Sequence, residues 1–312
     1  MKAMRLAEAA SSPTTLVEAS IPAPQPGPGE VLVRVSAAGV IRTELNWYPT
    51  THTKAGATRT GAVPAHEFSG TVAAVGEGVH DFTIGQPIFG MNDWFQQGAL
   101  AEYCLALATS IAPAPLTLTP AEAATVPISA LTAWQGLFYR GHLHPGDRVL
   151  IHGGAGGVGL FAVQIAHLHG AHVIATASPA NFDFIRQLGA DEVIDSRGAR
   201  FEDFIHQPLD IVFDTIGGDM LLRSLPLIRP GRFAVTITSD HEASTDPRIH
   251  EAFFIVEPNQ RQLMEIAALI DTHKLRTFVD AVVPFAEANL AYTGSPAKRL
   301  GHGKLVVAVA QP

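Results

Sequence analysis

The sequence predicts an α/β protein in which a doubly wound parallel sheet accompanies a mostly antiparallel β domain. Three observations support this fold class. A short apolar strand leads through a glycine cluster into an amphipathic helix within residues 148–169. After this unit, strands that are apolar on both faces alternate with helices, which is typical of a parallel sheet covered on both sides. Before residue 115, short β-type runs are separated by glycine and proline turns.

The glycine cluster contains the spacing G-x-G-x-x-G at Gly154, Gly156 and Gly159, with Gly157 and Val158 between them. Gly154 permits a tight turn, Gly156 lets a diphosphate approach the backbone, and Gly159 lets the helix pack closely on the strand. Backbone N–H groups at the positive end of the helix dipole favour a pyrophosphate. We therefore predict a dinucleotide site; the alternative is a packing turn without a ligand.

The order of elements follows from runs of apolar residues and the turns between them. Thr119, followed by Pro120 and Glu122, has the pattern of a helix start. The predicted strands are 31–35, 68–72, 87–89, 148–152, 172–177, 192–194, 210–214, 232–237, 278–283 and 304–309, and the predicted helices are 157–169, 180–188 and 260–273.

We assign the strands near the end of the chain to the β domain, because no helices alternate with them. The expected domains are 1–118 with 256–312 for the β domain and 119–255 for the dinucleotide-binding domain.

Composition excludes several classes of function. The 312 residues are 47% hydrophobic and 16% charged, which is enough for a sizeable core. The net charge of −8 argues against a nucleic-acid surface, and no apolar run approaches the length of a membrane span. A single cysteine, Cys104, excludes an internal disulfide and a multi-cysteine zinc site. We expect a cytoplasmic enzyme that binds neither nucleic acid nor membranes.

In these features the chain resembles the medium-chain dehydrogenase/reductase superfamily, and within it the zinc-free, zeta-crystallin-like quinone oxidoreductases. This resemblance implies a GroES-like β domain interrupted by a Rossmann domain, with the active site in the cleft between them. The segments that carry it are 37–40, 75–79, 129–134, 145–150 with the glycine turn, 188–191 and 303–307.

The resemblance also locates where zinc-dependent relatives hold their catalytic metal. Ile41 occupies the slot of the first cysteine, His66 fills the histidine slot, and Ile128 or a close neighbour stands at the second cysteine. Isoleucine cannot bind a metal, and one imidazole cannot hold a zinc that takes three protein ligands. We therefore expect no zinc.

Catalytic roles implied by the resemblance fall on three side chains. His66 is either a packed interior histidine or a general acid that protonates the substrate, for which an imidazole near its reference pKa is well suited. Thr43 stands where the zinc enzymes have a proton-relaying hydroxyl, and Tyr48 is an alternative; either is otherwise a packing or surface hydroxyl.

The expected substrate pocket is apolar and accepts aromatic compounds. Ile41, Tyr48, Trp94 and Phe95 are its candidate walls, and the last two lie in a loop containing glycine and glutamine, where exposed aromatics are less often mere core residues. Typical quinone reductases of this type carry Asn in the Ile41 slot, so the usual substrate contacts are in doubt.

The second strand of the dinucleotide unit ends without a carboxylate, which favours NADPH over NADH. Ser178 can bind a 2′-phosphate, Asn181 replaces the family's lysine, and Arg197 either supplies the missing charge or is a solvated loop residue. The residues that the resemblance places near the nicotinamide half, or else in ordinary packing, are Thr132, Thr215, Phe254 and Val256.

Together, these features predict zinc-independent hydride transfer from NADPH to a small-molecule quinone or α,β-unsaturated carbonyl. Two alternatives stay open: a zinc-type alcohol dehydrogenase and a non-catalytic NADPH-binding redox sensor. Segments 232–237 and 252–256 are expected to form an open sheet edge, so a homodimer is predicted.

Overall fold

The computed structural model describes residues 1–7, 15–198, 200–239, 246–294 and 299–310. Two compact units divide the chain. The first comprises Met1–Ile128, Pro258–His273 and Thr277–Pro312, and the second comprises Ser129–Glu257 and Lys274–Arg276. The chain thus passes from the first unit to the second after Ile128 and returns to the first after Glu257. The domain borders expected from the sequence, after residues 118 and 255, stay predictions.

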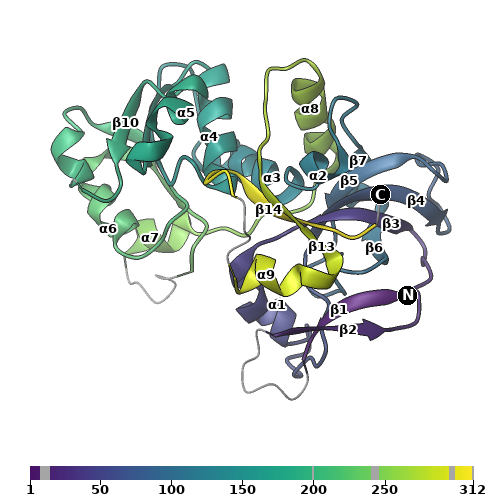
Figure 1. Ribbon diagram of the computed structural model, residues 1–312. Coiled ribbons are helices and arrows are strands. Elements are labelled where there is room, and N and C mark those ends of the chain that lie inside the picture. The colour runs from purple at the N-terminus through teal and green to yellow at the C-terminus, as the bar shows by residue number, and fades with distance from the viewer. Residues whose placement is uncertain (8–14, 199, 240–245, 295–298, 311–312) are drawn as a thin grey trace. The chain divides into compact units, whose positions relative to one another are not determined.

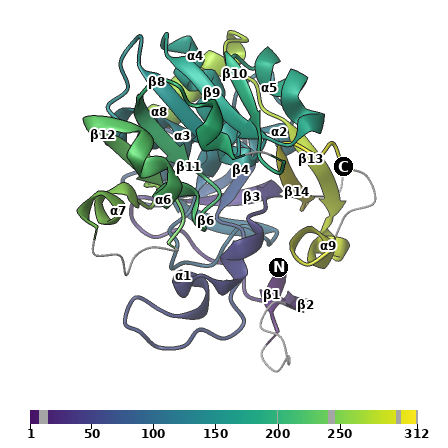
Figure 2. The same cartoon turned by 90° about the vertical axis from the view of Figure 1, so that its left-hand side faces the viewer.

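A parallel sheet of five strands forms the centre of the second unit. The strands are β8 (Arg148–His152), β9 (His172–Ala177), β10 (Glu192–Asp195), β11 (Leu209–Asp214) and β12 (Ile228–Thr236). They lie in the order β10-β9-β8-β11-β12, and every neighbouring pair is parallel. This is the doubly wound Rossmann order, which reverses at the first strand, and it confirms the predicted fold class (Figure 2).

The central strands β8, β9 and β11 are buried along nearly their whole length, because helices connect each strand to the next. The helices of this unit are α3 (Pro127–Gln135, which begins in the first unit), α4 (Gly157–Leu168), α5 (Phe182–Gln187), α6 (Met220–Ser224) and α7 (Pro247–Ala252). A π-helical turn over Gly136–Arg140 continues α3.

The predicted strand over 252–256 is wrong. Asp246 caps α7, its side chain accepting from the backbone N–H of Arg248, and Pro247 stands at the first helical position, so the chain turns into a helix up to Ala252. Phe253 makes only an isolated bridge to Thr236. Strand β12 is therefore the terminal strand of its sheet in the described part of the chain.

The first unit is built on a larger, mostly antiparallel sheet. Its strands are β3 (Glu30–Gly39), β4 (Glu67–Val75), β5 (Pro87–Met91), β6 (Tyr103–Leu107), β7 (Ile111–Pro113), β13 (Val279–Pro284) and β14 (Lys304–Ala308). A separate two-stranded antiparallel sheet is formed by β1 (Lys2–Leu6) and β2 (Leu16–Ser20). The order is β13-β14-β3-β4-β5-β7, with β6 paired to β3. This antiparallel sheet confirms the GroES-like part of the predicted fold.

Strands from both ends of the chain meet in this sheet. Strand β14 pairs antiparallel with β3, with Val306 opposite Gly39, and β13 pairs parallel with β14 (Figure 1). The first unit also holds the short helices α1 (Tyr48–Thr51), α2 (Pro120–Ala123) and α9 (Ala288–Tyr292) and the longer α8 (Gln260–Asp271). None of the described helices combines the length and apolar character needed to cross a membrane.

Candidate cofactor site and active-site residues

The glycine turn lies at the carboxyl end of β8, where the strand order reverses and doubly wound sheets bind their ligands. Helix α4 starts at Gly157, with Gly156 as its N-cap. A Cβ on Gly159 would collide with the carbonyl oxygen of Gly153, and one on Gly154 would lie 3.0 Å from the Cβ of Ala175. A Cβ on Gly156 would meet only the Gly153 oxygen, at 3.3 Å. The turn therefore packs tightly at two glycines and is open at Gly156, which fits a diphosphate.

Polar side chains, most of them buried, form hydrogen bonds at the base of this turn. The backbone N–H of Gly153 donates to Thr176 Oγ1 at 3.1 Å, and Thr215 Oγ1 donates to the carbonyl oxygen of His152 at 2.7 Å. The Nε2 of His152 lies 2.9 Å from Ser224 Oγ. Burial lowers the pKa of His152 to about 4, so its imidazole is neutral at neutral pH. These contacts fix the ends of β8 and β9 on which the turn rests.

Polar groups also gather after β9 and β10, the strands next to β8. Asn181 Nδ2 donates to Ser178 Oγ at 3.2 Å, so the structure brings these two predicted residues together. Arg197 is exposed in the loop that follows β10, which pairs with β9. The arrangement offers a hydroxyl, an amide and a guanidinium near one sheet edge, and these are groups that bind phosphate.

The residues expected near the nicotinamide half are mostly packed inside the second unit. Thr132 in α3 is buried, as are Phe254 and Val256 at 5% and 7% exposure. The guanidinium of Arg140 lies 5.7 Å from the centre of the Phe254 ring. Thr215, by contrast, is half-buried beside the glycine turn. The roles of these four residues stay predictions.

In the first unit, His66 lies just before β4 and is almost fully buried. Its Nδ1 is 3.1 Å from Oδ1 of Asn92, whose Nδ2 donates to the carbonyl oxygen of Gln97 at 2.9 Å. Because the amide oxygen of Asn92 can only accept, Nδ1 carries the proton and Nε2 is the acceptor nitrogen. Burial lowers the pKa of His66 to about 4, so the expectation of an imidazole near its reference pKa is wrong.

Aromatic rings surround this histidine. The centre of the Trp94 ring lies 5.3 Å from that of His66 and 5.5 Å from that of Trp47. Tyr48 is 55% exposed, and its ring centre lies 6.5 Å from that of Phe95. Trp94 and Phe95 are half-buried rather than exposed, since they pack edge-on against these neighbours. The structure therefore brings together four of the predicted residues: His66, Tyr48, Trp94 and Phe95.

Thr43 lies in a 3-10 turn over Arg42–Asn46, where it is exposed, and the described contacts give its hydroxyl no partner. Ile41 precedes this turn and is half-buried, whereas Ile128 is buried. Among the described residues, no group of three His, Cys, Asp or Glu side chains is placed to hold a metal ion. The donor set around His66 therefore does not fit a catalytic zinc.

Polar side chains near His66 that the sequence did not predict include Glu44, Asn92 and the lysine partner of Glu67. The carboxylate of Glu67 forms an ion pair with Lys304 Nζ, and its Oε2 accepts from the Ile128 N–H at 3.0 Å. Burial raises the pKa of Glu67, and the charge of Lys304 opposes this shift. In the sequence, the available signal for the Glu67–Lys304 pair was a lysine at the start of an apolar strand. No sequence signal indicated the contact of Asn92 with His66.

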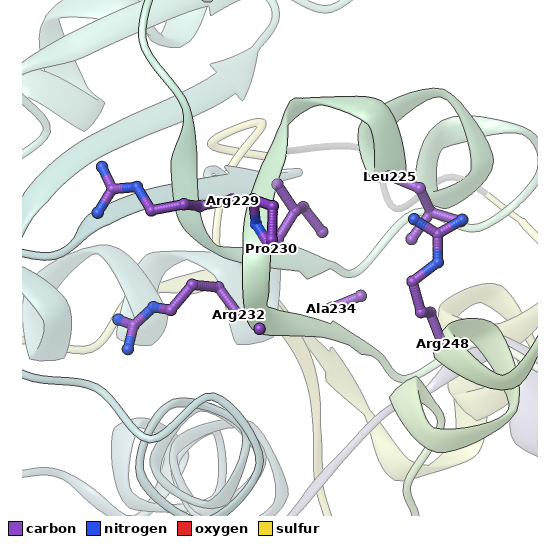
Figure 3. Close-up of a pocket in the computed structure, with 8 residues that line it drawn as sticks. Leu225, Arg229, Pro230, Arg232, Ala234 and Arg248 are labelled. Carbon is purple, nitrogen blue, oxygen red and sulfur yellow. The ribbon is translucent and has the colours of Figure 1, made fainter.

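A separate hollow of about 80 Å³ lies along β12 (Figure 3). Arg229 and Arg232 point away from Arg248, and both form ion pairs with Asp210. Arg248 is paired with Asp246. These guanidinium groups are engaged within the protein, so the hollow is not an anion site.

Comparison with known proteins gives matches over nearly the whole chain. The family model for an alcohol dehydrogenase GroES-like domain matches residues 27–116, and one for a zinc-binding dehydrogenase matches residues 188–307. An alcohol dehydrogenase superfamily protein from Novosphingobium aromaticivorans is 30% identical with a TM-score of 0.86, covering 99% of this chain and 100% of its own.

Two further relatives are similarly complete. A quinone oxidoreductase from Coxiella burnetii is 28% identical with a TM-score of 0.88 and 99% coverage of both chains. A probable zinc-binding mitochondrial oxidoreductase from Arthroderma benhamiae is 29% identical, covering 95% of this chain and 93% of its own.

Proposed function

Because the chain belongs to the medium-chain dehydrogenase/reductase superfamily, an oxidoreductase family that binds a nicotinamide cofactor, we propose that it transfers hydride from NADPH to a quinone or an α,β-unsaturated carbonyl. The observation that carries the proposal is the glycine turn at the end of β8. It is open at Gly156 and closed at Gly154 and Gly159, as a bound diphosphate requires.

Residues of the second unit would hold the cofactor. The backbone N–H groups at the start of α4 receive the diphosphate, and Ser178, Asn181 and Arg197 receive the 2′-phosphate of NADPH. When bound, the reduced nicotinamide supplies the hydride. Strand β9 is followed by Ser178 and not by a carboxylate, so the acid that usually selects the ribose 2′-OH of NADH is missing from this position.

Residues of the first unit would meet the acceptor. The half-buried rings of Trp94 and Phe95 and the exposed ring of Tyr48 favour a planar, conjugated acceptor. Ile41 and Ile128 replace the metal-binding cysteines of zinc-dependent relatives, so a metal-free reaction is part of the proposal. A conjugated acceptor needs less polarisation than a simple ketone.

Three side chains of the first unit would handle protons. His66 is neutral near pH 7 and presents Nε2 as an acceptor, so it binds a hydroxyl group and donates only after it has taken up a proton. The exposed hydroxyls of Thr43 and Tyr48 are the groups that exchange protons with water.

The test is NADPH consumption, followed by the near-ultraviolet absorbance of the reduced nicotinamide. Chelator-treated protein is assayed with p-benzoquinone, phenanthrenequinone and a short enone, each with NADPH and with NADH. We expect turnover that survives chelation and is faster with NADPH. Turnover that requires added zinc would indicate an alcohol-dehydrogenase-type enzyme instead.

A binding measurement separates the remaining alternative. NADPH binding, followed by quenching of tryptophan fluorescence, is measured on the same preparation. Clear binding without turnover of any acceptor would favour a non-catalytic redox sensor, whereas the absence of both would remove the dinucleotide site itself.

We also propose a homodimer formed through the edge strand β12, in the cytoplasm. An edge strand has unpaired backbone groups that a second copy can bind, and the single cysteine, Cys104, is buried and suits a reducing compartment. Light scattering tests the first statement: a single species of monomer mass, about 33 kDa, would contradict it.

A further inference from the structure

A fully buried carboxylate lies behind the His66 segment and joins three parts of the first unit. Glu44 accepts a hydrogen bond from the hydroxyl of Tyr292 in α9 at 2.6 Å. Its other oxygen accepts from the backbone N–H of Ala65 at 3.2 Å, and the Ile41 N–H lies 3.4 Å from the first. Glu44 has no exposed surface, so these bonds are not in competition with water.

Ala65, the residue before His66, has an unusual backbone. Its φ of 68° lies in the left-handed region, which is rare for a residue with a Cβ and persists only where neighbours hold it. Its N–H is bound by Glu44, and its carbonyl oxygen accepts from the Ala99 N–H at 2.5 Å. The direction in which the chain enters His66 therefore depends on the hydrogen bond to Glu44.

The other side of His66 is fixed independently. Glu67, the next residue, is held by Lys304 and by the Ile128 N–H, and the imidazole itself is held by Asn92. Ala65, with its left-handed backbone, is held by the Ala99 backbone and, among the described side chains, by Glu44.

We propose that Glu44 is a positioning residue: held by Tyr292, its carboxylate binds the Ala65 N–H and so fixes the His66 imidazole against Asn92 and Trp94. The contact of His66 with the substrate rests on the proposed function. The placement of the His66 imidazole is independent of that function and can be measured without turnover.

The charges around Glu44 give the proposal a pH signature. Burial raises the pKa of Glu44 to about 7, and the nearby negative charge of Glu67 adds to this shift. The hydrogen bonds from Tyr292 and Ile41 and the positive charge of Lys304 oppose the shift. An ionised carboxylate accepts more strongly than a neutral acid. The bond to Ala65 therefore weakens as the pH falls through about 7, well above the pKa of about 4 of His66 itself.

The experiment measures the ¹⁵N resonances of the His66 ring in the full chain between pH 5 and 9, assigned with His66→Asn. Wild type is expected to show a protonated Nδ1 and a small step near pH 7. Glu44→Gln abolishes the step, and Tyr292→Phe shifts it to higher pH, because the carboxylate then loses its strongest donor. Glu77→Gln, an exposed glutamate, and Tyr139→Phe, an exposed tyrosine, are the matched controls and keep the wild-type curve.

Activity is the second readout. With quinone and NADPH, Glu44→Gln is expected to lower kcat about tenfold while KM changes less than twofold, as for a displaced catalytic group. If Glu44→Gln does not fold by circular dichroism, Tyr292→Phe, which removes one hydroxyl, carries the test. Wild-type His66 resonances and titration in both variants would overturn the proposal. Wild-type protein that shows the step near pH 7 but no turnover would leave the positioning role intact and remove the proposed function.

Discussion

Asn92 binds His66 twice across the pair of strands β4 and β5. Its backbone N–H donates to the His66 carbonyl oxygen at 3.0 Å, and its side-chain oxygen lies 3.1 Å from the His66 Nδ1. The register that places Glu67 opposite Met91 brings these residues together. The side-chain bond determines which imidazole nitrogen bears the proton and leaves Nε2 as an acceptor.

Replacing Asn92 tests this relationship. Asn92→Asp puts a buried carboxylate beside Nδ1, which favours the charged imidazole and raises the pKa of His66. If His66 passes protons, the acidic limb of the kcat profile moves to higher pH by at least one unit. Asp81→Asn, which alters an exposed carboxylate that is not among the groups shifting the pKa of His66, is the control. A profile that does not move in Asn92→Asp would indicate that His66 is only a packed residue.

The glycine turn makes different predictions for two of its residues. Gly159→Ala forces a Cβ against the Gly153 carbonyl, so we expect a loss of about 2 kcal/mol of stability together with cofactor binding. Gly156→Ala meets little within the protein and is expected to keep its melting temperature. It should nevertheless weaken NADPH binding at least tenfold, because the new methyl group occupies the approach of the diphosphate.

Thermal unfolding and fluorescence titration of both variants separate these effects. Equal NADPH affinity of Gly156→Ala and wild type would mean that the turn serves packing alone.

Cofactor preference is tested at Ser178 and Asn181. Ser178→Ala removes a hydroxyl that binds the 2′-phosphate and should weaken NADPH binding about tenfold, since a hydrogen bond to a charged group contributes roughly 1.5 kcal/mol. Asn181→Lys adds a charge and should strengthen it. NADH affinity serves as the internal control and should stay within twofold in both variants. Parallel changes in the two affinities would contradict the assignment of the phosphate site.

Acid should destabilise the second unit through His152. Its folded pKa is lowered to about 4, below the unfolded value of 6.5, so the unfolded state binds the additional proton. Stability is then lost as the pH falls from about 6.5 towards 4, with a slope of up to about 1.4 kcal/mol per pH unit. His152→Gln keeps a donor for Ser224 and does not titrate, so its melting temperature should vary less over this range. Equal slopes for the variant and wild type would exclude His152 as the source.

The aromatic surface predicts selectivity among acceptors. Trp94→Ala should raise KM for phenanthrenequinone roughly fivefold and KM for a short enone much less, because ring stacking contributes about 1 kcal/mol. Tyr139→Ala, which removes an exposed aromatic of the second unit, is the control. Equal changes for both acceptors would mean that Trp94 does not face the substrate.

The sequence was most informative where structure depends on neighbouring residues. The turn from β8 through Gly156 into α4 lies within one short segment, and so does the capping box in which Thr119 and Glu122 exchange hydrogen bonds. The predicted strand at 252–256 failed because the Asp246 cap and Pro247 start a helix there, and tertiary packing leaves Phe253 a single bridge.

The polar contacts around His66 were not predictable in the same way. Asn92 reaches His66 through the register of β4 with β5, and Tyr292 reaches Glu44 from 248 residues further along the chain. Neither the register of two strands nor a contact between distant residues produces a periodic pattern that can be recognised in a single sequence. Burial, which sets the pKa of both His66 and Glu44, also depends on the complete fold.

The pairing of β14 with β3 has a consequence for synthesis of the protein. During translation, β3 leaves the ribosome early, but β14, which covers its edge at Ala37–Gly39, is the last of the described strands to be made. The nucleotide-binding segment, which is nearly continuous in sequence, is completed in between. Until β14 is made, this edge of β3 in the nascent β domain is therefore unpaired. A chain shortened before Lys304 would keep the edge exposed and prone to aggregation.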